Sequence, residues 1–334
     1  MIEVKNLSKE FKKPVREEGV IGMFKTLFSR KYTVKKAVDN ITFSIKQGEI
    51  VGYIGSNGAG KSTTIKMMCG ILTPTNGSVY IDGDEPYLKR KKVAQKIGVV
   101  FGQKSQLWWD IPLKESFKVL KEMYLINDND YNDRMEFLCD TLGIREFINQ
   151  PVRTLSLGQR MRADLAASWL HNPKVLFLDE PTIGLDVFVK DKIRDAIKIM
   201  NEKYNTTVVL TTHDMEDIEN LCSRVILIES GKIIFDGPLE NIKYRFGDLR
   251  TISINLKEDI DVNYLDSFNE RIEYQKDNDT LIVKFNALNI DLEEVMTYLL
   301  KNVKVNDIKI NEIGIEDVVK NIYSDEEKRR NTNA

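Results

Sequence analysis

The sequence predicts an α/β domain with a largely parallel sheet, followed by a smaller α+β domain. From about Ile41 to Phe246, short apolar segments alternate with amphipathic ones, as buried strands and their covering helices do. Beyond Gly247, apolar and polar residues alternate singly, which is typical of strands with one exposed face. The length of 334 residues fits two domains of ordinary size. We therefore predict domains at residues 1–246 and 247–334.

Composition and charge favour an ordinary globular protein. Hydrophobic residues make up 42% of the chain and charged residues 30%, with a formal net charge of -2. This balance gives no reason to expect a nucleic-acid partner. We find no apolar run of the roughly 18 residues that a membrane helix needs, and the first residues lack a signal-peptide core. We therefore expect any membrane role to depend on a separate protein, and the three widely spaced cysteines to be reduced cytosolic thiols.

Four apolar segments predict the buried strands of the first domain, and the segments between them predict its helices. The strands are "EIVGYIG", "KIGVVFG", "KVLFLDE" and "TTVVLTTH", and the helices include "SFKVLKEMYLI", "MRADLAASWLH" and "VKDKIRDAIKIM". The segment "RVILIESGKIIFDG" predicts a hairpin, because two apolar stretches flank the turn residues Ser230 and Gly231.

The second domain follows a β-α-β-β-α-β pattern. Its strands are predicted in "RTISINL", "RIEYQKD", "LIVKFNA" and "VNDIKINEI", and its helices over Val262–Glu270 and Asp291–Asn302. This order indicates a small split-βαβ arrangement. A final amphipathic helix is predicted from Ile315 to Ile322, before a polar tail, because apolar residues recur there at i, i+3, i+4 and i+7.

A basic segment from about residue 12 to 36 interrupts the start of the first domain. It carries eight lysine or arginine residues and two glutamates, in a chain that is slightly acidic overall. Apolar residues between Val20 and Phe28 recur at helical spacing and predict an amphipathic helix. Such a helix suits an anionic membrane surface or a partner protein, or it packs on the core of this chain while its lysines stay solvated.

The stretch "GSNGAGKST" fits the pattern G-x-x-x-x-G-K-[ST] of P-loop NTPases, between a predicted strand and a predicted helix. Its glycines let backbone N–H groups approach phosphate oxygens, and the helix start adds its positive dipole end. Lys61 is expected to neutralise the β- and γ-phosphates, and the hydroxyl of Ser62 to bind Mg²⁺. The predicted nucleotide-binding residues of this loop are Gly55, Ser56, Asn57, Gly58, Ala59, Gly60, Lys61, Ser62 and Thr63.

Acidic residues and a histidine end two other predicted strands. Asp179 and Glu180 follow the apolar run of "VLFLDEP", at the sheet edge where α/β proteins bind ligands. We expect Asp179 to bind Mg²⁺ and Glu180 to polarise the attacking water. His213 ends "VLTTH" and is predicted to contact the γ-phosphate, whereas His171 lies in a helix-to-strand turn and is expected to be structural.

A second polar helix start lies at "LSLGQRMR". Ser156 and Gln159 stand in the S-x-x-Q spacing of a capping box. A capped helix start offers free N–H groups, a hydroxyl and positive dipole charge, and so predicts a further anion site.

These motifs together resemble the ATP-binding subunits of ABC transporters. "LSLGQ" is similar to the signature LSGGQ of that family, Asp186 in "DEPTIGLD" matches the D-loop aspartate, "GQ" at Gly102 and Gln103 matches the Q-loop, and "TTHD" matches the switch histidine. The resemblance implies ATP and Mg²⁺ as ligands, a helical subdomain that carries the signature, and a role for Gln103 in sensing Mg²⁺ and the γ-phosphate. Among family members, the drug- or viologen-type exporters look most similar.

The resemblance further implies that two subunits share each active site. Ser156, Gly158 and Gln159 would close over the nucleotide held by a second ATP-binding subunit, so that one dimer sandwiches two nucleotides. Leu157 stands where the family usually has glycine; we expect this position to space the loop, because the flanking signature residues are intact. Phe11 matches the aromatic residue that stacks on adenine, although it is equally consistent with a core phenylalanine.

The resulting functional hypothesis is an ATP-hydrolysing subunit that drives a separate integral-membrane permease from the cytoplasmic face, in the direction of export. The alternative is a soluble ABC-type ATPase without a transporter. The repair proteins of that class carry long coiled-coil insertions and the translation factors carry two cassettes, and neither feature is found in this sequence. A guanine-binding N-K-x-D motif is not found either.

Overall fold

The computed structural model describes residues 1–14, 32–102, 104–246, 249–258, 265, 272–287 and 289–312. The chain divides into two compact units, Met1–Gly237 and Pro238–Ala334. This division falls before the domain boundary predicted at residues 246 and 247, because the helix α9 (Leu239–Phe246) groups with the second unit.

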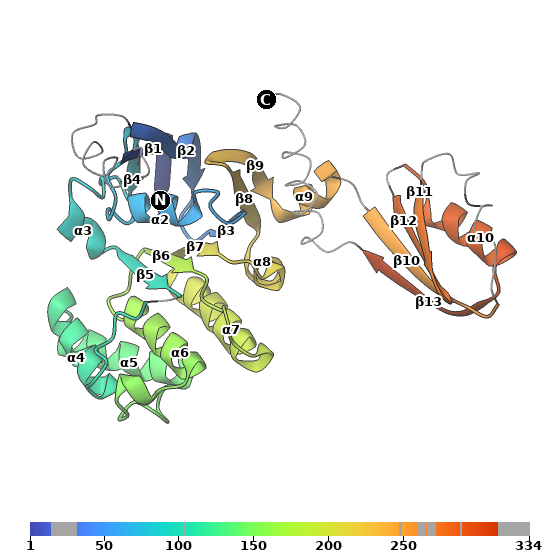
Figure 1. Cartoon of the computed structure of the whole chain (residues 1–334). Helices are drawn as coiled ribbons and strands as arrows, with labels where there is room; N and C mark the ends of the chain where they lie inside the picture. The colour runs from blue at the N-terminus through green and yellow to red at the C-terminus, as the bar shows by residue number, and fades with distance from the viewer. Residues whose placement is uncertain are drawn as a thin grey trace, which may run out of the picture. The chain divides into compact units, whose positions relative to one another are not determined.

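A six-stranded sheet forms the centre of the first unit (Figure 1). Its strand order is β5-β6-β7-β3-β8-β9, and the neighbouring pairs from β5 to β8 are parallel. This sheet confirms the predicted α/β class, and β8 and β9 flank the predicted turn. The strands are β3 (Ile50–Gly55), β5 (Ile97–Phe101), β6 (Val175–Asp179), β7 (Thr207–Thr211), β8 (Arg224–Glu229) and β9 (Lys232–Pro238).

A three-stranded antiparallel sheet packs beside this core in the order β2-β1-β4. Its strands are β1 (Ile2–Pro14), β2 (Tyr32–Ile45) and β4 (Asn76–Ile81). Beyond the buried part of the sheet, β1 and β2 pair as a ribbon as far as the partners Pro14 and Tyr32. Both ends of the predicted basic segment are therefore strands, and the amphipathic helix predicted between Val20 and Phe28 lies outside the described residues.

Helices cover the six-stranded sheet and build a separate helical region. The helices that border the sheet are α2 (Lys61–Met68), α3 (Arg90–Ala94), α7 (Val187–Tyr204) and α8 (Met215–Leu221). In Figure 1, α4 (Leu113–Tyr124), α5 (Asp128–Leu142) and α6 (Leu157–Trp169) lie together below the sheet, and α4 and α5 both contact α6. A short 3₁₀ helix, Val152–Thr154, leads into α6. This group confirms the predicted helical subdomain.

His171, just after α6, has the surroundings of a structural residue. Its ring stacks on Tyr124 with the centroids 3.9 Å apart, and Nε2 lies 2.9 Å from the carbonyl oxygen of Ile97. Burial lowers the pKa of His171 to about 4, so the imidazole is neutral at pH 7.

A buried ion pair joins α7 to α8. Asp217 is fully buried, and Nε of Arg194 donates a hydrogen bond of 2.7 Å to its carboxylate. The hydroxyls of Thr182 and Thr212 donate to the other carboxylate oxygen. Because every oxygen of Asp217 is bonded, the charge is tolerated in the interior. The same cluster fixes the loop after β6 and the loop after β7.

The second unit has a core of its own beneath a four-stranded antiparallel sheet. The strand order β11-β12-β10-β13 is the one that a split-βαβ arrangement has. Apart from Leu265, the predicted helix Val262–Glu270 lies outside the described residues, as does the predicted final helix from Ile315. The elements are β10 (Leu249–Leu256), β11 (Ile272–Asp277), β12 (Thr280–Asn286), α10 (Leu292–Asn302) and β13 (Val305–Glu312). Within the described parts of both units, none of the helices combines the length and the apolar character of a membrane span.

We predict that Arg194→Met lowers the free energy of unfolding by about 3–5 kcal/mol, because it leaves the carboxylate of Asp217 buried without its cationic partner. Urea unfolding at pH 7, followed by circular dichroism, measures this loss. Lys190→Met is the matched control on the same helix. It removes a pair with Asp214 whose side chains are 23% and 25% exposed, and it should cost less than the loss of Arg194, because the carboxylate of Asp214 keeps Arg194 at 3.7 Å. Equal losses in the two variants would contradict the structural importance of the buried pair.

Candidate functional site

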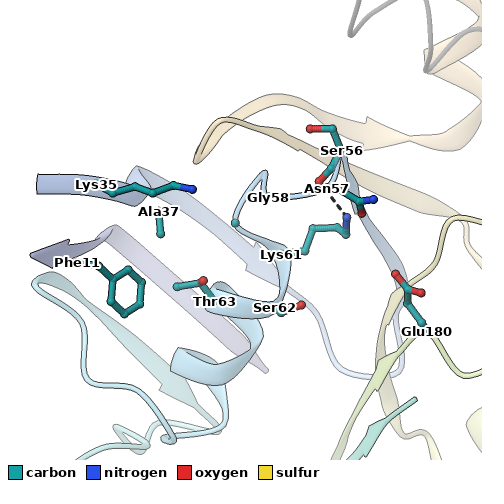
Figure 2. Close-up of a pocket in the computed structure, with 11 residues that line it drawn as sticks. Phe11, Lys35, Ala37, Ser56, Asn57, Gly58, Lys61, Ser62, Thr63 and Glu180 are labelled. Atoms are coloured by element: carbon teal, nitrogen blue, oxygen red, sulfur yellow. Dashed lines mark hydrogen bonds between the residues drawn. The ribbon is translucent and has the colours of Figure 1, made fainter. Parts of the chain in front are cut away.

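The loop between β3 and α2 borders a cavity of about 320 Å³. Figure 2 shows its side chains arranged from Phe11 at one end to Glu180 at the other, with the loop between them. The lining residues are Phe11, Lys35, Ala37, Ser56, Asn57, Gly58, Gly60, Lys61, Ser62, Thr63 and Glu180.

Lys61 begins α2, and its ammonium is held by the loop that precedes the helix. Its Nζ donates to the carbonyl oxygens of Gly55, at 2.6 Å, and Ser56, at 3.2 Å. Burial lowers the pKa of Lys61, although the carboxylates of Glu180 and Asp179 act in the opposite direction. The two hydrogen bonds therefore fix the ammonium at the cavity, near the carboxylates of Glu180 and Asp179.

Gly60 allows the close packing of the loop. Its φ of 112° lies in the left-handed region, and a Cβ atom at this position would be 2.4 Å from the carbonyl oxygen of Ala37. Glycine satisfies both constraints because it lacks the atom that would clash. The contact fixes the loop against β2.

Asp179 ends β6 and brings a carboxylate to Ser62 on α2. The hydroxyl of Ser62 lies 3.4 Å from Oδ2 of Asp179, and the hydroxyl of Thr211 donates to Oδ1 at 2.5 Å. These oxygens border a second cavity, of about 530 Å³, lined by Ser62, Lys66, Ile71, Phe101, Gly102, Lys104, Asp179, Glu180 and Ile183. A hydroxyl and a carboxylate with phosphate oxygens form the kind of ligand set that Mg²⁺ takes, so the residues present fit this ion. Among the described residues, no group of three or more histidine, cysteine, aspartate or glutamate side chains forms a metal site without a phosphate ligand.

Glu180 and His213 face each other at the ends of neighbouring strands. Nε2 of His213 lies 2.9 Å from Oε1 of Glu180. Glu180 has a φ of 57°, which is unusual for a residue with a side chain, and its N–H donates to the carbonyl oxygen of Thr211 at 2.9 Å. Strain of this kind costs about 1–3 kcal/mol and is concentrated at functional sites. In this conformation Glu180 lines both cavities.

The predicted Q-loop glutamine, Gln103, lies outside the described residues. The residues on both sides of it, Gly102 and Lys104, line the second cavity. The N–H of Gly102 donates to the carbonyl oxygen of Asp179 at 2.8 Å, which fixes the start of the Q-loop beside the acidic strand end.

Phe11 lies on the β1–β2 ribbon and is not part of the buried core. It is 37% exposed, it lines the first cavity, and the ammonium of Lys9 lies 5.5 Å from its ring centroid. An aromatic face at the end of a phosphate-binding loop can stack on a base.

The signature helix α6 starts with the predicted capping box, which the structure confirms. The N–H of Gln159 donates to Oγ of Ser156 at 3.2 Å, and Oε1 of Gln159 accepts from the N–H of Ser156 at 2.9 Å. Leu157 leaves this cap intact, and its side chain contacts Gly184 in the D-loop. The signature residues Ser156, Gly158 and Gln159 line neither cavity, so the anion site predicted at this helix start lies apart from both of them.

The D-loop aspartate, Asp186, has a structural role in this chain. It is the N-cap of α7, and its carboxylate accepts a hydrogen bond of 3.0 Å from the N–H of Val189. Val189 in turn contacts Gly158, where a Cβ atom would lie 3.1 Å from the valine side chain. The D-loop and the start of the signature helix therefore pack together.

Sequence analysis missed Lys35 and Ala37 in the first cavity, and Thr211 and Glu229 behind it. Glu229, at the end of β8, accepts a hydrogen bond of 2.5 Å from the hydroxyl of Ser56. Had a strand been predicted over these residues, Lys35 and Ala37 would have been expected on the same face of it, because they are two residues apart.

Comparison with known proteins identifies the family. The sequence pattern described as ABC transporter matches residues 38–183. NatA of Bacillus subtilis, an ABC transporter ATP-binding protein, is 34% identical over 215 residues, which cover 64% of this chain and 87% of NatA. The chain belongs to the ABC transporter family of ATP-binding proteins.

Other relatives in this family differ in length and in the kind of transport that their names state. The probable multidrug ABC transporter ATP-binding protein YbhF of Escherichia coli is 35% identical over 68% of this chain and 39% of its own length. MetN of Staphylococcus haemolyticus, a methionine import ATP-binding protein, is 33% identical over 82% of this chain and 82% of its own length. Both multidrug-type and import proteins are thus similar to this ABC ATPase.

Solved structures show the same cassette. A dimeric ATP-binding cassette in a post-hydrolysis state with ADP and Pi is 27% identical, with a TM-score of 0.59, over 72% of this chain and 99% of that chain. CbiO1 of Clostridium perfringens, part of the ABC transporter complex CbiONQ, is 26% identical, with a TM-score of 0.59, over 73% of this chain and 90% of that chain. The P-loop NTPase fold of this ABC ATPase is therefore shown.

A buried carboxyl group connects the signature helix to the segment that follows the Q-loop. Asp164 on α6 accepts hydrogen bonds from the hydroxyl of Ser105, at 2.8 Å, and the N–H of Gln106, at 3.2 Å. Burial raises the pKa of Asp164 to about 6 from an ordinary value of 3.8. The folded protein therefore holds this proton more tightly than the unfolded chain does.

We predict that Asp164→Asn stabilises the protein at pH 7 by up to about 3 kcal/mol and leaves stability at pH 4 nearly unchanged. The raised pKa means that ionisation destabilises the fold as the pH rises from about 4 through 6, and asparagine removes this charge while its oxygen still accepts both hydrogen bonds. Thermal unfolding across this pH range measures the difference. Asp164→Ala, which loses the acceptor, should be less stable at both pH values; a pH-independent difference for Asp164→Asn would contradict the prediction.

Proposed function

We propose that this ABC ATPase binds ATP with Mg²⁺ and hydrolyses it, releasing the γ-phosphate, to power a separate membrane permease. The observation that carries the proposal is the meeting of Glu180 with His213 at the edge of the cavity that the phosphate loop lines. A carboxylate beside a phosphate site can accept a proton from a water molecule, and the imidazole can hold the carboxylate in place or contact the phosphate.

The predicted site residues have separate roles in this proposal. The backbone of residues 55–60 and the ammonium of Lys61 bind the phosphates, and Phe11 stacks on the adenine. Ser62 and Asp179, with Gln103, would hold Mg²⁺, which neutralises charge on the phosphates. His213 contacts the γ-phosphate.

The second anion site supports a shared active site. Ser156 uses Oγ as an acceptor within its own capping box, so that its O–H proton is left to donate outward to an anion. Together with Gly158 and Gln159, it would act on the nucleotide bound by a second copy of the chain. The dimeric form of the related cassette with ADP and Pi supports this arrangement.

The proposed partner is an integral-membrane permease, with the chain at the cytoplasmic face of the membrane. CbiO1 is part of a transporter complex, and this relationship supports a similar assembly here. Trp108 and Trp109, just beyond the Q-loop, are 40% and 51% exposed and suit a protein contact.

We propose export as the direction, because YbhF has a multidrug-type name. Transport assays in inside-out vesicles would separate export from import, which the name of MetN states.

We predict that Glu180→Gln reduces steady-state ATP hydrolysis by at least about a hundredfold while ATP binding is retained, because glutamine cannot accept the proton of the attacking water. A phosphate-release assay and equilibrium binding of ATP measure the two quantities. Lys61→Ala is the companion variant, and it should lose binding as well as turnover. Near-native turnover of Glu180→Gln would refute the assignment of Glu180 as the base.

We predict that mixing Lys61→Ala chains with Ser156→Arg chains restores activity that neither variant has alone. In a head-to-tail dimer, one site receives both lesions and the other receives neither, so an equal mixture should reach about a quarter of native ATP hydrolysis if the sites are independent. Activity is measured against the mixing ratio and should be greatest near equal amounts. Activity that stays at the level of the separate variants would show that each chain completes its own site.

A further inference from the structure

Lys35 is a second cation on the wall of the first cavity. It pairs directly across the β1–β2 ribbon with Phe11, so that the two side chains lie on the same face. Both residues line the cavity, and Lys35 is exposed. Among the residues that the structure describes, no carboxylate forms an ion pair with Lys35, so its charge faces the cavity uncompensated.

The neighbouring lysine shows the opposite arrangement. Lys36 pairs with Glu10 across the ribbon and lies on its other face, where its ammonium is 3.3 Å from Oδ1 of Asp39. It does not line the cavity. The two lysines therefore share a strand and a charge, but only Lys35 faces the phosphate loop.

The side chain of Lys35 extends toward the loop. In Figure 2 its amino group points in the direction of Gly58, on the opposite side of the loop from Lys61. Gly58 has a φ of 84°, and a Cβ atom built there would have no neighbour within 4 Å, so the loop is open at this position. A polyphosphate lying along the loop would thus have one lysine on each side.

We propose that Lys35 is a second phosphate-binding cation of the nucleotide site and contacts the phosphate nearest the nucleoside. This inference rests on the proposed function of the site as a nucleotide-binding site. The position of Lys35 along the cavity indicates which phosphate it contacts. Lys35 comes from the same strand pair as Phe11, at the proposed base end, whereas Glu180 lies at the proposed γ-phosphate end. Lys35 acts as a point charge, which is how lysine binds phosphate.

The charge balance of the cavity explains the need for this cation. Glu180 lies at one end, and Glu229 accepts a hydrogen bond from Ser56 on the loop. These carboxylates oppose an anionic ligand. An additional cation at the exposed end of the cavity strengthens the attraction for the phosphates and increases its dependence on salt.

The test compares Lys35→Met with Lys36→Met in the full-length chain. Both substitutions keep an unbranched side chain that is one heavy atom shorter, and both remove one positive charge from the same strand. Displacement of a fluorescent ADP analogue by ATP, ADP, AMP and adenosine, without Mg²⁺, measures the four dissociation constants at low and physiological salt. We expect Lys35→Met to weaken ATP, ADP and AMP by a similar factor, about three- to tenfold, and to leave adenosine unchanged. Lys36→Met should bind all four as the native chain does.

The outcomes separate this inference from the proposed function. If the native chain binds ATP and ADP and Lys35→Met binds them equally well, the inference is wrong and the proposed function stands. An equal loss for adenosine and ADP would also overturn it, because Lys35 would then act on the base or on the packing of Phe11. If none of the four ligands displaces the analogue from the native chain, the proposed function itself is wrong. A loss in Lys35→Met that decreases from low to physiological salt supports the phosphate contact.

Discussion

The buried pair of Arg194 and Asp217 is the interaction on which the geometry of the loops after β6 and β7 depends. One carboxylate oxygen accepts from the guanidinium, and the other accepts from Thr182, after the acidic end of β6, and from Thr212, directly before His213. A charge buried in this way is stable only while all of its partners are present. The cluster therefore holds the loops that carry Glu180 and His213 in one arrangement, although the two residues belong to different strands.

The residues of the site meet because they follow the ends of parallel strands. Parallel strands deliver their carboxyl ends to one edge of the sheet, which brings Asp179 from β6 close to Ser62 after β3. Thr211 ends β7 between them and fixes Asp179 by a hydrogen bond. The start of the signature helix is positioned by a different element, the helical subdomain, so it lies apart from the two cavities beside the phosphate loop.

Much of the central fold and the phosphate site could be predicted from the sequence. A short apolar run such as "VLFLD", followed by turn residues, favours a buried strand over a helix, and the G-x-x-x-x-G-K-S spacing between a strand and a helix predicts a loop that brings its N–H groups together. The β1–β2 ribbon could not be predicted, because its exposed strands carry lysines on both faces and have no apolar alternation. Lys35 was missed for the same reason. The bond of Ser56 to Glu229 joins residues far apart in the chain, and no local pattern indicates it.

The ribbon has a consequence for how this protein can change through evolution. The strand register shifts between Lys9 and Glu10, so that Ala37 is an extra residue on β2, and beyond this bulge Phe11 again stands opposite Lys35. A side chain changes face whenever the register slips by one residue, so this bulge, the last of three register shifts along the pair, sets Lys35 rather than Lys36 opposite Phe11. Residues 15–31 join the strands only after this point, at Pro14 and Tyr32. Insertions and deletions there can accumulate without altering which lysine stands opposite Phe11, whereas a ladder that paired Ala37 with Glu10, without the bulge, would place Lys36 there instead.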